Sequence, residues 1–378
     1  GDTPEDRWPA AARWLDESGY PDTHAYLRAS AVAVLEESGL LPHLNPGVLS
    51  WEQLQRLRPV APSMGMMLET TSRRLFETPG EVHYGSPDKD PDVRTRVLAD
   101  AGRSSIPFTT GLLLGIGESP EEFVDALLTI RSLGREYGHI QEVLIQNFRA
   151  KPRTAQARRP DLSDNAYLAA IAVTRILLGP RFRVQAPPNL TDPGALGRLV
   201  AAGVDDFGGI SPVTPDHVNP ERPWPTVEAV RWEIAPAGFD LEPRLTVHPE
   251  YVREAQRWID PKLHGHVSAL ADRRGLAGLP IRPQPRPWQH EDAGYAAFAA
   301  RNSGGRVDLG ASIDTLGRHT DLRGDAGEVY GDWGAIADRL ADDALLPTLE
   351  LLALGDQPVE RAPDLVPSER DRAESRQP

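Results

Sequence analysis

A glycine-rich turn beside a carboxylate is the feature of this sequence most suited to chemistry. An apolar run with the pattern G-x-L-x-G-x-x-E contains Gly111 and Gly115 and ends on Gly117 and Glu118. Glycine has no Cβ, so a ligand can touch the main chain at such positions. The helix expected to follow would direct free N–H groups toward the same place. The alternative is a tight strand-to-helix turn that needs glycine only for its dihedral angles.

Three other stretches carry side chains that could bind a ligand. Glu69 follows an apolar run that holds all three methionines, and its carboxylate could accept hydrogen bonds from a sugar diol or simply cap a helix. Gly1, Asp2 and Glu5 stand together before a helix-like segment. The stretch 205–225 mixes acids, a glycine pair, hydroxyls, an asparagine and prolines. Such a rigid loop is costly for mere connection, and we expect it to face a substrate.

Composition excludes several classes of function. The chain has 378 residues, a net charge of −14 and no cysteine. The charge disfavours a role in nucleic-acid binding, and the lack of cysteine excludes disulfides, zinc–thiolate sites and thiol nucleophiles. No apolar run is long enough for a membrane span, and the start does not resemble a signal peptide. No G-x-S-x-G, P-loop or H-E-x-x-H motif occurs. We therefore expect a cytoplasmic enzyme or binding protein.

Strand-like runs alternate with helix-like segments through the first two thirds of the chain. Their spacing of mostly twenty to forty residues is typical of strand–helix units in a parallel sheet, either a closed (β/α) barrel or an open doubly wound sheet. Both architectures collect function at the carboxyl ends of the strands. The expected strands lie in 39–47, 60–68, 106–115, 142–148, 181–188 and 204–211.

The helices between these runs have clear start and stop signals. Ser119 opens a capping box, and the helix after it is expected to end at Gly134. Ser163 opens a second helix, and a third is expected from about Asp192 to Gly203. The positions expected to face inward are Phe123, Leu127 and Ile130 in the first helix, Leu168, Ile171, Ala172 and Ile176 in the second, and Leu196, Leu199 and Val200 in the third.

The organisation changes after the last expected strand. We expect residues 1–245 to form the barrel-like part, and 246–289 to form a helical extension with a proline-rich, extended end. Residues 290–378 are more polar and predict an interdomain linker or tail whose last dozen residues are disordered.

Taken together, the strand ends resemble the radical S-adenosylmethionine (SAM) superfamily and, more narrowly, the FO synthase family, which builds a deazaflavin chromophore. The match covers roughly residues 1–290 and is closest to the first catalytic half of the fused actinobacterial form. It rests on several motifs in the same order, and the stretch 305–333 is similar to the linker between the two halves. The motifs include GDTPEDRW, APSMGMMLETTS, AGRSSIPFTTGLLLGIGE, QEVLIQNFRAKP and VQAPPNL.

The resemblance implies a (β/α) barrel with SAM lying across its top. The residues that match the cofactor motifs follow successive strands. They are Gly1, Asp2 and Glu5 for the methionine amino group, Glu69 for the ribose hydroxyls, and Gly111, Gly115, Gly117 and Glu118 for the adenosyl part. By position along the chain, we expect the uracil and ribityl groups of the substrate beside Gln146, Asn147, Gln185, Asn189, Asp206, Ser211 and Asn219.

This sequence departs from the family at the residues that bind the iron–sulfur cluster. Full-length members hold a [4Fe-4S] cluster through a C-x-x-x-C-x-x-C loop, and cluster irons need thiolate ligands that this chain lacks. The family places that loop before the motif found here at residue 1. We therefore expect an incomplete barrel without its first strand and most of its second, no bound metal, and no activity for the chain alone. The second radical SAM half would be supplied by further sequence or by another subunit.

The resemblance implies a lyase acting on a tyrosine–5-amino-6-(ribitylamino)uracil adduct to form 7,8-didemethyl-8-hydroxy-5-deazariboflavin. Two other functions stay open at this point. Related radical SAM enzymes of menaquinone biosynthesis share the strand motifs, and a cluster-free barrel could merely bind a nucleoside.

Overall fold

The structure is a computed structural model of the whole chain. It describes residues 3–151, 154, 156–192, 194–211, 216, 219, 221–278, 281, 283–284, 286 and 288, and the short strands Ser312–Ile313 and His319–Thr320. Gly1 and Asp2, and the expectations for 290–378, lie outside the described residues, apart from those two strands, which pair antiparallel. The domain boundaries at 245 and 289 stay predictions.

A parallel sheet forms the centre of the described fold. Its strands are β1 (His43–Leu44), β2 (Ser63–Gly65), β3 (Phe108–Leu114), β4 (Ile140–Asn147) and β5 (Val184–Gln185), and they neighbour one another in chain order. A single parallel bridge from Gln185 to Asp206 adds the sixth expected run. Sequential parallel neighbours separated by helices are the topology of a (β/α) barrel. Among the described strands the series does not return to β1, so the predicted incomplete barrel is confirmed.

The two faces of this sheet have opposite chemistry. Successive side chains of a strand point to opposite faces, and the face toward the helices is apolar, with Met64, Phe108 and Val143 each at most 1% exposed. The inner face carries Thr109 on β3 and Glu142 on β4, which are register partners. The barrel interior is therefore polar, and it is the part of the fold that can hold a functional site.

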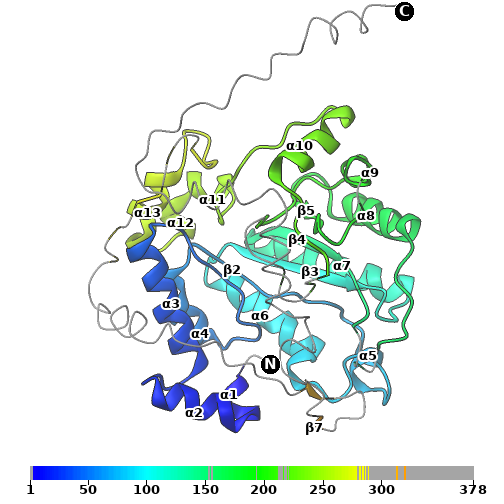
Figure 1. Ribbon diagram of the computed structural model, residues 1–378, viewed down its shortest axis with the longest axis horizontal. Coiled ribbons are helices and arrows are strands. Elements are labelled where there is room, and N and C mark those ends of the chain that lie inside the picture. The colour runs from blue at the N-terminus through cyan, green and yellow to red at the C-terminus, as the bar shows by residue number, and fades with distance from the viewer. Residues whose placement is uncertain are drawn as a thin grey trace, which may run out of the picture. The chain divides into compact units, whose positions relative to one another are not determined.

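Helices cover the outer face, and Figure 1 shows α6, α7 and α8 around the strands. Their bounds are as follows: α1 Pro4–Arg7, α2 Pro9–Glu17, α3 Thr23–Glu37, α4 Trp51–Leu57, α5 Arg73–Glu77, α6 Pro91–Arg103, α7 Pro120–Tyr137, α8 Asp164–Leu178, α9 Leu196–Ala202, α10 Val227–Ile234, α11 Pro249–Arg253, α12 Ala255–Trp258 and α13 His264–Leu270.

The cap predictions at Ser119 and Ser163 are confirmed, and three helix details are wrong. Ser119 and Ser163 are the N-caps of α7 and α8. Helix α7 runs past Gly134 to Tyr137, and its C-cap is Gly138, whose left-handed φ of 75° suits glycine. Helix α9 begins at Leu196 rather than at about Asp192, and its N-cap, Ala195, has no side chain that could accept from the first turn. Ile176 is 78% exposed, because the buried stripe of α8 passes through Tyr167, Ile171, Thr174 and Leu178 instead. Successive residues are about 100° apart around a helix, so a buried stripe displaced by one position leaves Ile176 on the exposed side.

The segment after residue 245 packs on the same apolar core as the sheet. Its helices α11 to α13 confirm the predicted helical character. Trp288, 1% exposed, donates its indole N–H to Pro59 O at 3.1 Å, and Arg28 Cζ and Lys262 Nζ lie 5.1 and 5.0 Å from its ring centroid. None of the helices in the described part of the chain is long and apolar enough to cross a bilayer.

Candidate functional site

The turn after β3 is closed by its own carboxylate. Glu118 Oε1 accepts from Gly115 N at 2.7 Å, and Oε2 accepts from the backbone N–H of Ile116 at 2.9 Å and of Gly117 at 3.0 Å. Ser119 and Glu122 then satisfy one another's backbone N–H in a capping box. The expectation of free N–H groups at this turn is therefore wrong, because the side chains of the turn and helix already accept these hydrogen bonds.

The glycines of this motif have different structural causes. Gly115 and Gly117 have φ of 85° and 109°, a region that residues with a Cβ rarely adopt. Gly111 lies within β3, where a Cβ would come 2.1 Å from the carbonyl oxygen of Leu144 on β4. Gly111 is thus needed for strand pairing, and the other two form the exposed turn at the strand end.

Glu69 is held in an unusual conformation beside the same strand end. Its φ is 64°, uncommon for a residue with a side chain, and its main chain bridges to β3 at Leu112. The carboxylate is 13% exposed; Oε1 lies 2.5 Å from Lys89 Nζ, and Oε2 lies 2.9 Å from His83 Nε2. Arg94 Nη1 is 3.7 Å away. Burial acts to raise the pKa of Glu69, but Lys89, His83 and Arg94 together hold it well below its ordinary value.

Glu5 has a structural partner in this fold. Its two carboxylate oxygens accept from Thr23 N at 3.0 Å and from Thr23 Oγ1 at 2.6 Å, at the first residue of α3. A carboxylate at a helix N-terminus complements the positive end of the helix dipole. Glu5 therefore fastens α1 to the start of α3. Its predicted neighbours in the motif, Gly1 and Asp2, are outside the described residues.

A buried ionic network fills the barrel interior at the level of Glu142. Arg244 Nη2 donates to Glu142 Oε2 at 2.7 Å and to Asp206 Oδ1 at 2.8 Å. Gln185 Nε2 donates to the same two carboxylates at 2.9 and 3.3 Å. His248 Nε2 lies 3.3 Å from Glu142. Paired charges with several hydrogen bonds are the form in which ionised groups are tolerated in an interior.

The network keeps its carboxylates ionised. Burial acts to raise the pKa of Asp206, but the guanidinium of Arg244 outweighs it and brings the pKa to about 2. The same balance lowers the pKa of Glu142. Ligand atoms of Glu142, Asp206 and His248 lie within 4.8 Å of one another, close enough to hold a metal ion. A cation there would have to displace the guanidinium, which both carboxylates already bind.

A cavity of about 290 Å³ opens above this network, at the carboxyl ends of β4 and β5. Four of the residues predicted for the substrate come together in its wall: Gln146, Gln185, Asn189 and Asn219. The other wall residues are Leu144, Pro187, Leu190, Phe207, Gly208, Gly209, Asp216 and Trp224. Asp206 is beneath the cavity in the ionic network, and Ser211 is not in the wall. Most of the expected substrate residues therefore surround one space.

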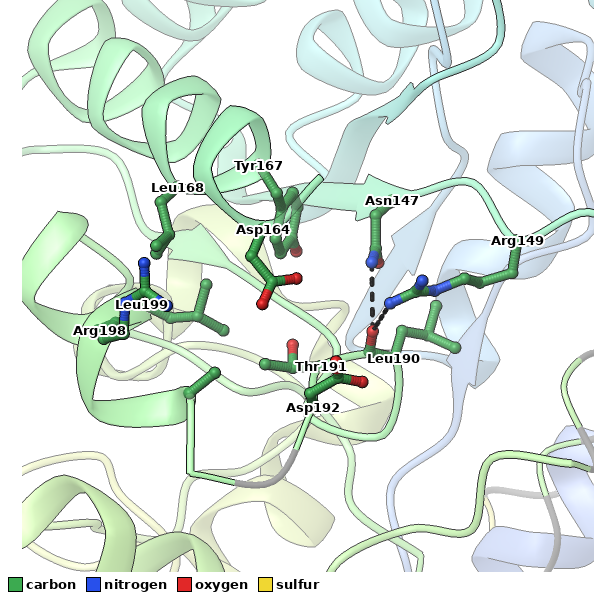
Figure 2. A pocket seen from close by; sticks show the side chains of 11 residues that line it. Asn147, Arg149, Asp164, Tyr167, Leu168, Leu190, Thr191, Asp192, Arg198 and Leu199 are labelled. Atoms are coloured by element: carbon green, nitrogen blue, oxygen red, sulfur yellow. Dashed lines mark hydrogen bonds between the residues drawn. The ribbon is translucent and has the colours of Figure 1, made fainter. Parts of the chain in front are cut away.

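Asn147 faces a second, very small pocket on the other side of the strand end. Figure 2 shows Asn147 and Arg149 both reaching the backbone oxygen of Leu190, at 3.2 and 2.7 Å. This double hydrogen bond fixes the turn after β5, and Asn189 is the preceding residue. Asn147 thus supports the cavity wall from behind.

Four important residues of the site were missed by sequence reasoning. Glu142 had a signal, because it precedes Gln146 by four positions and so lies on the same face of the strand. Arg244 and His248 had none, since they lie after the last expected strand in a segment without a motif. Trp224 was within the expected substrate loop but was not singled out.

The sheet, its polar interior and the cavity at the strand ends define an α/β protein with an incomplete (β/α) barrel. No family model matches the chain. FO synthase of Mycobacterium tuberculosis (strain CDC 1551 / Oshkosh) is 56% identical over 345 residues, which is 91% of this chain and 40% of that protein. FO synthase of Streptomyces coelicolor is 55% identical over 342 residues, 90% of this chain and 39% of that protein.

A shorter relative matches along most of its own length. The 7,8-didemethyl-8-hydroxy-5-deazariboflavin synthase of Methanopyrus kandleri is 43% identical over 278 residues, 73% of this chain and 81% of that protein. The chain belongs to the FO synthase family. It spans about 40% of the length of its actinobacterial relatives. Among solved structures, HydG, a maturase of the [FeFe]-hydrogenase, has a TM-score of 0.47 at 18% identity, over 60% of this chain and 49% of that chain.

Proposed function

We propose that this chain forms the adenosyl- and substrate-binding part of a radical SAM lyase. The reaction would close the ring of 7,8-didemethyl-8-hydroxy-5-deazariboflavin from a tyrosine–5-amino-6-(ribitylamino)uracil adduct. The observation that carries the proposal is the amide-rich cavity at the ends of β4 and β5, in a member of the FO synthase family. Side-chain amides both donate and accept, which suits an imide ring and a polyhydroxyl chain.

The residues around Glu69 fit a nucleoside. A carboxylate has about four lone-pair sites, and the partners of Glu69 leave capacity for a ribose diol. Because its pKa is held low, Glu69 stays an acceptor at neutral pH. The turn at Gly115 and Gly117 would contribute shape, since its N–H groups already bind Glu118. SAM bound here would bring its adenosyl group beside the cavity, because β3 and β4 are neighbouring strands.

The residues of this chain do not fit a [4Fe-4S] cluster, because the chain contains no cysteine. The chain's own part is to bind and orient: Gln146, Gln185 and Asn189 hold the polar edges of the substrate, while Trp224 and Phe207 cover its flat face. The remaining length of the actinobacterial relatives suggests that a further segment or subunit acts with it.

The identity to FO synthases does not favour the menaquinone alternative or a cluster-free binder. The proposal is tested by measuring the binding of SAM and of 6-(ribitylamino)uracil to this chain by calorimetry. We expect both to bind, and Glu69→Gln to weaken SAM at least tenfold without changing the affinity for the uracil. Glu242→Gln, which alters an exposed ion pair, is the control. Absence of binding for both ligands would overturn the proposal.

A further inference from the structure

The amides in the cavity wall are held in fixed orientations by carboxylates. An ionised carboxylate accepts hydrogen bonds and cannot donate, so an amide beside it must turn its NH₂ group toward it. Gln185 contacts Glu142 and Asp206, and Asn189 contacts Asp216 at 2.8 Å. Each amide therefore has its nitrogen turned to protein acids and its oxygen left for something else.

Gln185 is positioned by the ionic network beneath the cavity. Its Nε2 donates to two carboxylates whose charge Arg244 maintains, and the residue is 9% exposed. Gly208, with φ of 68°, leaves room for the amide, because a Cβ there would come 2.5 Å from Nε2. The oxygen Oε1 is thus the polar atom of Gln185 that a ligand in the cavity can reach.

Asn189 has an acceptor without a donor. Its Nδ2 donates to Asp216 and, at 3.4 Å, to Arg222 O. Its Oδ1 is buried and receives no hydrogen bond from any residue in the described ranges, although the residue is 5% exposed. A buried acceptor without a donor is costly, and Asn189 belongs to the cavity wall, so a ligand in the cavity is the available source of the missing donor.

From these two oxygens we infer that the cavity selects an uncharged part of the ligand, one that offers N–H or O–H donors at two points. Gln185 and Asn189 are the specificity-determining residues, and both act as acceptors. Glu142, Asp206 and Asp216 add negative charge behind the amides, which opposes a carboxylate or phosphate at this place. This inference rests on the proposed function and assigns the recognition of the uracil N–H groups to these two amides.

The experiment compares 6-(ribitylamino)uracil with its N1,N3-dimethyl analogue by calorimetry on the full chain. The methyl groups remove the two ring donors and keep the ribityl hydroxyls and the carbonyl acceptors. We expect the analogue to bind at least tenfold more weakly to the unmodified chain, a difference of about 1.4 kcal/mol. This comparison does not depend on the folding of any variant.

Two variants separate lost hydrogen bonds from simple steric exclusion of the methyl groups. In Gln185→Met and in Asn189→Leu the preference for the parent uracil should fall at least threefold, because one acceptor is gone while an apolar wall accepts a methyl group. Asn165→Leu, at an exposed amide on α8, should leave the preference unchanged.

The outcomes separate the inference from the proposed function. Equal binding of both uracils, or an unchanged preference in both variants, overturns donor selection but leaves the proposed substrate standing. Failure of both uracils to bind overturns the inference for this cavity; if SAM still binds through Glu69, the cofactor part of the proposed function survives.

Discussion

Arg244 lies 2.7 Å from Glu142 although 102 positions of the chain separate them. The contact joins β4 to the segment that follows α10, and through Asp206 it reaches the sixth run of the sheet. One guanidinium thus pairs with two carboxylates inside the barrel and, through them, orients the amide of Gln185. The stability of the interior and the geometry of the cavity depend on the same cation.

Removing that cation should destabilise the fold strongly. In Arg244→Met, Glu142 and Asp206 keep their burial but lose their principal partner. Breaking a buried pair in this way costs about 3 to 5 kcal/mol. We expect a loss of that size in the free energy of unfolding measured with urea at pH 7.

Arg274→Met is the matched control for this variant. Arg274 also pairs with two acids, Glu242 and Asp272, but its side chain is 63% exposed. Exposed pairs contribute about 0 to 1 kcal/mol. If Arg244→Met cost no more than Arg274→Met, the network would have no special role in stability.

Acid should weaken the fold through Asp206. Its pKa is about 2 in the folded chain and 3.8 when unperturbed. A lowered carboxyl pKa contributes stability that is complete above the unfolded pKa and is lost as the pH falls through the folded value. The loss is roughly 2 kcal/mol. In Asp206→Asn the unfolding free energy should be lower at pH 7 and should fall less steeply between pH 4 and 2; an unchanged slope contradicts the assignment.

The fold should also lose stability over a second range at higher pH, because two histidines are buried. Burial lowers the pKa of His139 to about 4 from 6.5, and that of His43 likewise to about 4. A histidine kept neutral in the folded state costs stability as the pH falls from its unfolded pKa toward its folded one. His139 should therefore remove on the order of 3 kcal/mol between pH 6.5 and 4.

His139→Phe removes the proton site and keeps an aromatic ring of similar size. Thermal unfolding followed across pH 7 to 4 should show about half the original loss, since His43 is still present. A variant that loses as much stability as the parent over this range would show that His139 is not the responsible group.

The sequence was sufficient for the strands but not for the interior of the barrel. Each expected strand run contains a strand or bridge, because apolar runs and caps such as Ser119 and Ser163 are local signals. Which group accepts hydrogen bonds from the backbone N–H groups at Gly115 was not predictable in the same way. Whether Glu118 turns back to accept them depends on its rotamer, which no pattern of residue types records.

The candidate site shows the same limit. Gln146, Gln185, Asn189 and Asn219 were found because polar residues at parallel strand ends must gather at one edge. Arg244 was not found, because its role depends on a long-range contact with Glu142. A lone arginine after the last strand is in most chains a solvated charge.

The role of Gly111 in the fold can be separated from any role in ligand binding. An added Cβ would lie 2.1 Å from Leu144 O, a backbone atom in a paired strand that cannot move alone. Gly111→Ala should therefore lower the free energy of unfolding by about 1 to 3 kcal/mol or more, the usual cost of overpacking. Gly265→Ala is the control, because a Cβ at that position in α13 meets nothing within 4 Å. Urea denaturation of the ligand-free chain should show the first loss and a neutral or slightly stabilising effect of the second. Should Gly111→Ala prove as stable as the parent while its SAM affinity falls, Gly111 would belong to the nucleoside site rather than to the pairing of β3 with β4.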